Sequence, residues 1–151
     1  MTAYTVEEVV RRFAALFLSF DYEKEYALLG ISRLHPHRRK RARHEFMALY
    51  ISLWRLALEK SMPQDAEEIS QTYLETMGEE LKEDDKELRL LRQQVEVYDT
   101  LLAPTKDGDF KEISQFLLKN VFKDDKEREN LALKISLAVR ETYNLIFERL
   151  V

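Results

Sequence analysis

The chain has 151 residues, a formal net charge of −4, and 45% hydrophobic beside 34% charged residues, which is the balance of a folded globular protein and excludes a disordered one. This length suits one domain with a core of its own, and we predict a single domain over 1–151. The absence of cysteine excludes disulfides, thiolate metal sites and cysteine nucleophiles.

The N-terminal region does not resemble a secretory signal, because Glu7 and Glu8 precede its apolar stretch and Asp21 follows it. The longest apolar run, Phe46 to Trp54, is interrupted only by Ser52 and is far shorter than the roughly 20 residues that cross a bilayer. By default we expect a cytoplasmic protein with no membrane partner.

Apolar residues recur with helical spacing along nearly the whole chain, and only three Gly and three Pro interrupt it. We therefore predict an all-α bundle of six or seven helices. The first helix should run from about Thr5 to Ser19, with Thr5 and Glu8 forming a capping box. A short helix should follow over 22–30.

The next predicted helix is long and hydrophobic. Pro36 suits its first turn, and the pattern continues to about Lys60. From Phe46 to Leu58 the sequence is apolar almost all round the helix, which leaves a narrow polar strip. The strip consists of Glu45, Ser52, Arg55 and Glu59. A helix of this kind is normally central to a bundle or buried by a second subunit.

Four more helices are predicted, each from capping residues at its start. Gly78 should end or bend the first of them, and Pro104 should stop the second. Their starts are expected at Ser61 with Gln64, at Asp84 or Asp85, at Asp109 with Glu112, and at Asp124 with Glu127.

One internal match suggests a pseudo-twofold repeat. Residues 45–53 and 129–137 are identical at six of nine positions, and each half of the chain would then read long helix, short helix, long helix. The alternative is a chance match between two helices rich in Leu and Ala. We favour the chance match, because nothing along the flanking residues supports the repeat.

A basic segment, residues 33–44, is the most unusual feature of the chain. It holds six Lys or Arg and all three histidines, and it contains no acidic residue. Since the whole chain carries −4, the remainder carries −10. Charge concentrated in this way favours a partner or one internal surface. The candidate anion- or partner-binding residues are Arg33, His35, His37, Arg38, Arg39, Lys40, Arg41, Arg43 and His44.

Most of these cations fall in the first turns of the long helix, where the partial positive charge of the helix N-terminus disfavours them by a few tenths of a kcal/mol each. Three kinds of compensation are open. They are a polyanion such as RNA, DNA or a phosphorylated ligand, an acidic protein partner, and an acidic tract of this chain within one subunit or across a dimer. We favour the tract, because charge runs are usually solvated or paired locally. It comprises Glu79, Glu80, Glu83, Asp84, Asp85 and Glu87.

The sequence predicts no metal and no cofactor. His37 and His44 are seven residues apart and share a helical face, but the cations between them would repel a divalent ion. There is no glycine-rich phosphate loop and no Gly-x-Ser-x-Gly nucleophile motif. Capping also explains the paired carboxylates. We therefore do not predict an enzyme, although the sequence leaves this open.

The leading functional hypothesis is a non-enzymatic protein–protein interaction or regulatory module that forms a homodimer. Its basis is the nearly all-apolar helix together with the opposed charge blocks. The first alternative is an anion-binding module for RNA, DNA or a phosphorylated ligand, using residues 33–44. The second alternative is a small-molecule binder or an enzyme with a pocket between helices.

Overall fold

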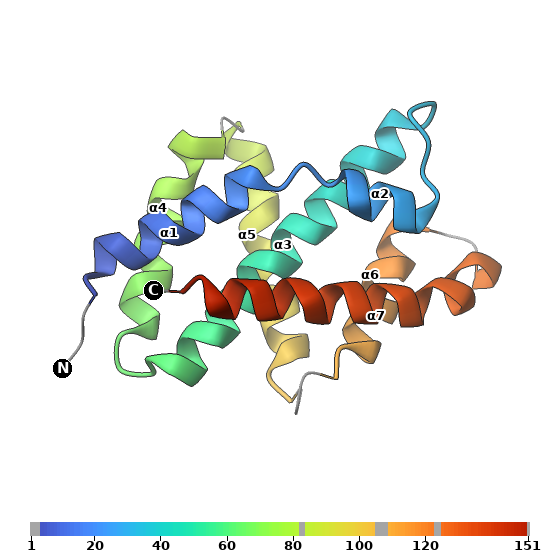
Figure 1. Ribbon diagram of the computed structural model, residues 1–151. Helices are drawn as coiled ribbons and strands as arrows, with labels where there is room; N and C mark the ends of the chain where they lie inside the picture. Colours follow the sequence, from blue (N-terminus) through green and yellow to red (C-terminus); the bar gives the residue numbers. More distant parts are fainter. Residues whose placement is uncertain (1–3, 82–83, 105–108, 123–124, 151) are drawn as a thin grey trace.

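A computed structural model describes residues 4–81, 84–104, 109–122 and 125–150, and for 79–81 and 125–130 it describes the backbone only. Over these residues the chain forms seven helices and no strand, which confirms the all-α prediction (Figure 1). None of the described helices combines the length and the apolar character that a bilayer crossing requires. The helices are α1 (Val6–Ser19), α2 (Glu23–Leu29), α3 (Pro36–Ser61), α4 (Ala66–Leu81), α5 (Asp85–Leu102), α6 (Lys111–Val121) and α7 (Asp125–Glu148).

Helix α3 is the central rod of the bundle and contacts α4, α5, α6 and α7 (Figure 1). From Phe46 to Leu58 its side chains are buried, apart from Arg55 and Leu56, which are half-buried. Burying a large apolar side chain contributes about 1.5–3 kcal/mol, so this stretch is a major source of stability. The other helices of the chain provide that burial, and α3 needs no second subunit to cover it.

An aromatic cluster joins α1, α3 and α4. The Phe13 ring stacks on the Trp54 ring with centroids 4.2 Å apart, and Tyr73 meets both rings edge-on. Such pairs contribute about 0.5–1.5 kcal/mol beyond the burial of their area. Trp54 is the only tryptophan of the chain and is 1% exposed, so its fluorescence can report on the packing of this corner.

Two helix starts follow the predicted caps. The Thr5 side chain accepts a hydrogen bond from the Glu8 amide at 3.1 Å, and the Glu8 carboxylate accepts one from the Thr5 amide at 3.4 Å. At α5, the Asp84 carboxylate accepts from the Glu87 amide at 2.7 Å. Each side chain satisfies an amide that has no partner within its helix.

Two other expectations about helix ends differ from the structure. Ser61 cannot cap α4, because it is the last residue of α3, and α4 begins at Ala66. Of the two outcomes expected at Gly78, the end of the helix is wrong, because α4 continues to Leu81. A Cβ atom on Gly78 would come within 2.9 Å of Leu88 Cδ1, so the glycine gives α5 room to approach α4.

The remaining two helix starts lie near their predicted caps. Helix α6 begins at Lys111 after Phe110, and the Asp109 carboxylate accepts the Lys111 amide at 3.2 Å. The cap expected at Asp124 lies outside the described residues, and α7 begins at Asp125.

The order of helix lengths matches the suggested repeat, but the packing does not follow a two-fold axis. Both α1–α2–α3 and α5–α6–α7 read long, short, long. The contact of α3 with α6 has its counterpart in the contact of α7 with α2. However, α5 packs mainly on α3, whereas α1, its equivalent, packs mainly on α4. The outer helices therefore break the symmetry.

Candidate interaction surface

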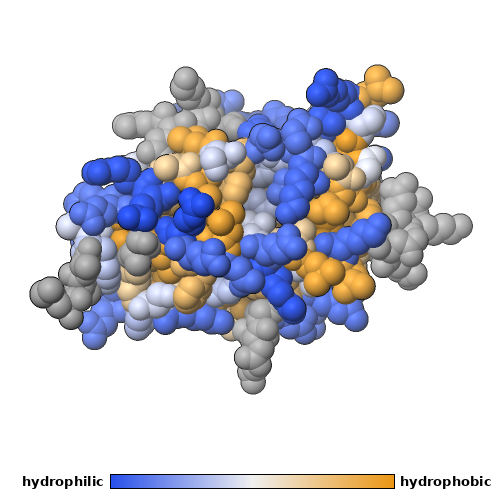
Figure 2. Space-filling view, viewed as in Figure 1, coloured by the Kyte–Doolittle hydropathy of each residue, from blue (hydrophilic) through white to orange (hydrophobic). Residues whose placement is uncertain are grey.

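The basic segment forms the α2–α3 loop and the first turns of α3, at one end of the molecule (Figure 1). At this end Figure 2 shows strongly hydrophilic residues beside an exposed hydrophobic group. Three of the candidate residues, Arg39, Arg43 and His44, are half-buried. The exposed ones are Arg33, His35, His37, Arg38, Lys40 and Arg41.

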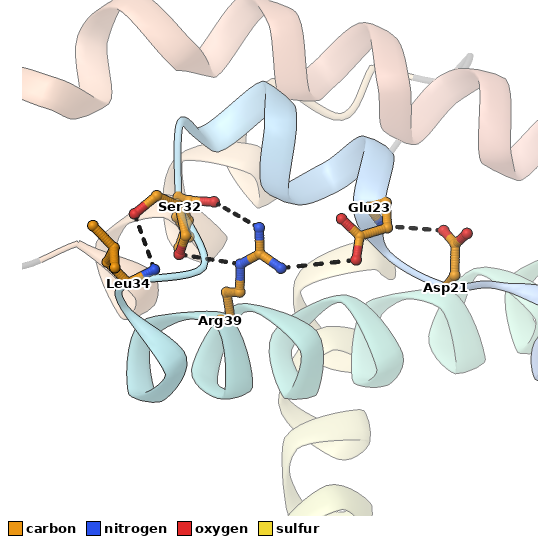
Figure 3. Close-up of polar contacts among 6 residues, drawn as sticks. Asp21, Glu23, Ser32, Leu34 and Arg39 are labelled. Atoms are coloured by element: carbon orange, nitrogen blue, oxygen red, sulfur yellow. Dashed lines mark hydrogen bonds and ion pairs between the residues drawn. The ribbon is translucent and has the colours of Figure 1, made fainter.

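Arg39 ties the start of α3 to α2 (Figure 3). Its Nε donates to the Ser32 carbonyl at 3.2 Å, and Nη2 donates to the Ile31 carbonyl at 3.3 Å. The third nitrogen, Nη1, lies 3.7 Å from Glu23 Oε1. The guanidinium also covers the Tyr26 ring at 4.6 Å from its centroid. Through these four contacts, the Arg39 guanidinium helps to hold the start of α3 against α2 and the loop that follows it.

Arg38 and Arg41 reach the C-terminal end of α6. Arg41 Nη1 donates to the carbonyl of Val121, the last residue of that helix, at 3.5 Å. The Arg38 guanidinium lies 5.4 Å from the centroid of the Phe122 ring. A helix C-terminus carries partial negative charge, so cations that are unfavourable at the start of α3 are favourable there. The sequence alone gives no sign that the C-terminus of α6 offsets the charge of these arginines.

Of the acidic tract, one described carboxylate contacts the basic segment. Glu87 Oε1 lies 3.3 Å from Lys40 Nζ, and Glu87 Oε2 lies 3.6 Å from His44 Nε2. Asp84 caps α5 instead, and Asp85 is exposed. The partners of Glu87 are themselves partly exposed, so each pair contributes at most about 1 kcal/mol. The side chains of Glu79, Glu80 and Glu83 lie outside the described part.

The remaining candidates make few polar contacts. His35 Nδ1 lies 3.0 Å from Ser32 Oγ, and Arg43 Nη1 lies 3.7 Å from Met47 Sδ. Within the described ranges, Arg33 and His37 have no polar partner. Those ranges also contain no group of three or more His, Cys, Asp or Glu residues placed to hold a metal ion.

The narrow polar strip of α3 faces α5. Glu45 is the centre of this contact, because Glu45 Oε1 accepts from Tyr98 Oη at 2.6 Å and from Gln94 Nε2 at 3.0 Å. A third donor, Asn120 Nδ2 of α6, lies 2.8 Å from the same oxygen. One carboxylate therefore joins three helices, and its hydrogen bonds replace those it would make to water.

Two further pairs continue the same seam. Ser52 Oγ donates to the Val95 carbonyl at 2.9 Å, and Arg55 Nη1 lies 2.7 Å from Asp99 Oδ2. Burial raises the pKa of the Asp99 carboxyl, and the Arg55 charge opposes this only in part. Glu45, Ser52 and Arg55 of the polar strip therefore find partners on α5, whereas Glu59 at its end is exposed.

A second buried carboxylate lies between α2 and α3. Glu25 is 9% exposed, and its Oε1 accepts from Tyr50 Oη at 2.7 Å. Burial raises the pKa of Tyr50 well above its ordinary 10.0, and the charge of Glu25 adds to the effect. Tyr22 stacks on Tyr50 and has a left-handed backbone, with φ of 65°. The Tyr50 phenol therefore stays protonated and donates a hydrogen bond to the Glu25 carboxylate.

A groove runs beside the α3–α5 seam, with a volume of about 390 Å³. Its lining combines polar and apolar side chains. The lining residues Leu90 and Val97 are 51% and 40% exposed, and Leu101 beyond them is 37% exposed. The lining residues are Arg41, His44, Glu45, Glu87, Leu90, Leu91, Gln93, Gln94 and Val97.

Comparison of the chain with protein-family models, with curated proteins and with solved structures found no match. Its function is therefore inferred from its own surfaces. The sequence analysis missed the groove and the partners of Glu45. A usable signal was present, since Glu45 and Ser52 are seven apart on one helix, and Gln94 and Tyr98 are four apart on another.

Proposed function

We propose that this protein is a non-enzymatic helical module that acts through protein–protein contact and forms a homodimer. The observation that carries the proposal is the apolar face of α5, where Leu90, Val97 and Leu101 are exposed beside a groove. Three large apolar side chains in a row on a folded surface favour contact with another protein.

Two features that favour a partner in the sequence do not carry this proposal. The apolar length of α3 is covered by the helices of this chain. In the basic segment, Arg39 contacts α2, and Arg38 and Arg41 lie at the end of α6. The outer face of α5 remains, and apolar side chains exposed there favour association.

Sedimentation equilibrium of the purified protein tests the homodimer. We expect the weight-average mass to rise from one chain towards two across the micromolar range. Replacing an exposed apolar residue of α5, as in Val97→Asp, should restore the monomer, whereas Leu18→Asp on the exposed side of α1 should not. A single-chain mass at every concentration would remove the homodimer from the proposal.

A second candidate is anion binding at the exposed end of the basic segment. It is supported by Arg33 and His37, which have no polar partner in the described part, and by the neighbouring Arg38. Arginine suits phosphate because its planar group pairs with two oxygens at once.

Fluorescence anisotropy with a labelled single-stranded RNA, measured at rising salt, tests this candidate. Binding should weaken with salt, and Arg33→Ala with Arg38→Ala should reduce the slope of log affinity against log salt by about 1–2. Arg11→Ala with Arg12→Ala on α1 is the matched control. No binding at low salt would count against the nucleic-acid form of this candidate.

A further inference from the structure

The outer face of α5 carries apolar residues in the spacing of a helix–helix contact. Leu90, Val97 and Leu101 are separated by seven and then four positions, so they form one stripe along the helix. The adjacent side of α5, about 100° round the helix, holds Leu91, Val95, Tyr98 and Leu102, which are buried in the bundle. The apolar surface of α5 therefore continues from the bundle onto an exposed side of the helix.

The charged residues beside this stripe would be complementary between two copies of the chain. Arg89 and Glu96 are seven residues apart on one flank of the stripe, and both are exposed. Neither has an ion-pair partner among the described residues. In an antiparallel pair of identical helices, the same flanks of the two copies meet, so Arg89 of each copy would face Glu96 of the other.

From these features we infer that α5 pairs with α5 of a second copy in antiparallel orientation, about a two-fold axis near Gln93. Leu90 then packs at the level of the partner's Val97, and Arg89 lies at the level of the partner's Glu96. This inference rests on the proposed function, and it names the surface and the orientation of the dimer.

The geometry limits the strength of this dimer. Helix α5 has 18 residues and is about 27 Å long, so one helix pair covers less than the ~800 Å² per partner of a standard interface. We therefore expect a reversible dimer with a dissociation constant of about 1–100 µM.

Helix α7 is the competing surface, since Leu133 and Leu137 are 70% and 51% exposed. The α5 stripe is the stronger choice because it borders a groove that can receive side chains of the second copy.

Charge reversal tests the pairing. Arg89→Glu and Glu96→Arg should each weaken self-association about tenfold, because each places like charges together at two symmetric positions. Mixing the two variants should restore association as a heterodimer, in which every pair is again opposite in charge. Arg11→Glu on α1 is the matched control and should dimerise like the parent protein. Circular dichroism and Trp54 fluorescence would verify that each variant is folded.

Cysteine crosslinking tests the orientation, because the chain has no cysteine of its own. Gln93→Cys should form a disulfide between copies, whereas Leu101→Cys should not, since its Cα atoms would be about 24 Å apart. A parallel pair would instead crosslink at both positions and would overturn the antiparallel inference. A parent protein that dimerises while neither charge reversal nor Gln93→Cys has an effect would overturn the α5 surface but leave the homodimer standing. A strictly monomeric parent would overturn the α5 pairing and would remove the homodimer from the proposed function.

Discussion

Glu45 is a carboxylate whose three hydrogen-bond donors come from two other helices. A buried charge is tolerated when donors surround it, and removing it leaves those donors without an acceptor. Its importance follows from where the chain places α5 and α6. Sequence spacing shows only that Glu45 begins the polar strip of α3.

We expect Glu45→Ala to lower the free energy of unfolding by about 2–4 kcal/mol, because Tyr98, Gln94 and Asn120 lose a shared acceptor. Glu45→Gln keeps a carbonyl oxygen and should cost less than half as much. Urea unfolding followed by Trp54 fluorescence measures both changes. Equal losses in the two variants would show that the hydrogen bonds contribute little.

Arg39 is a second residue whose role depends on distant parts of the chain. The sequence identifies it as one of several equivalent cations. The structure separates it from Arg33, because Arg39 binds two carbonyls and covers an aromatic ring whereas Arg33 is exposed. Neighbouring residues of the same type therefore have different functions.

At the scale of elements, Arg39→Ala should loosen the attachment of α2 to α3 and lower the free energy of unfolding by about 1–3 kcal/mol. Arg33→Ala should change it by less than about 0.5 kcal/mol, as expected for an exposed residue. Chemical denaturation compares the two variants. Hydrogen exchange should also show faster opening of the amides in α2 for Arg39→Ala, and unchanged exchange there would contradict the assigned role.

Element positions could be predicted where the signals are local. Thr5 caps α1 and Asp84 caps α5, because a cap needs only its own side chain and an amide three residues on. Ser61 failed as a cap because it still belongs to α3, and residues 62–65 form a turn before α4 begins at Ala66. Gly78 failed as a stop because its small size serves the approach of Leu88, which is ten residues away in sequence.

The candidate site was predicted less well than the fold, since its geometry depends on which helices meet. The basic segment was found from composition alone, but its contacts with the ends of α2 and α6 were not. The partner of α3's polar strip was also missed. Hydrophobic periodicity identifies the polar face of a helix, but it does not show whether that face contacts water or a neighbouring helix.

For the molecule as a whole, buried phenols make stability depend on alkaline pH, and the largest pKa shifts belong to Tyr22, Tyr50 and Tyr98. Burial raises the pKa of Tyr22, Tyr50 and Tyr98 above the ordinary 10.0. Above about pH 10 the unfolded chain loses these protons while the folded chain keeps them. Their contribution is therefore fully present below pH 10 and is lost as the pH rises towards the folded-state pKa values.

We expect the free energy of unfolding to fall above about pH 10 by about 1.4 kcal/mol per pH unit for each of these tyrosines. Urea unfolding at several alkaline pH values measures the slope. Tyr50→Phe, which removes one phenol and keeps its ring, should reduce the slope by about 1.4 kcal/mol per pH unit. A flat profile over this range would contradict the burial of the three hydroxyls.

The central place of α3 also affects how the chain is made. Ribosomes synthesise α3 before α4, α5, α6 and α7, which are the helices that cover it. The stretch from Phe46 to Leu58 therefore stays exposed to water, or bound by a chaperone, until the ribosome has released the segment through α7. If a ribosome stalls between α3 and α7, the apolar surface of α3 remains exposed. Quality-control factors should therefore recognise such nascent chains more readily than the finished protein.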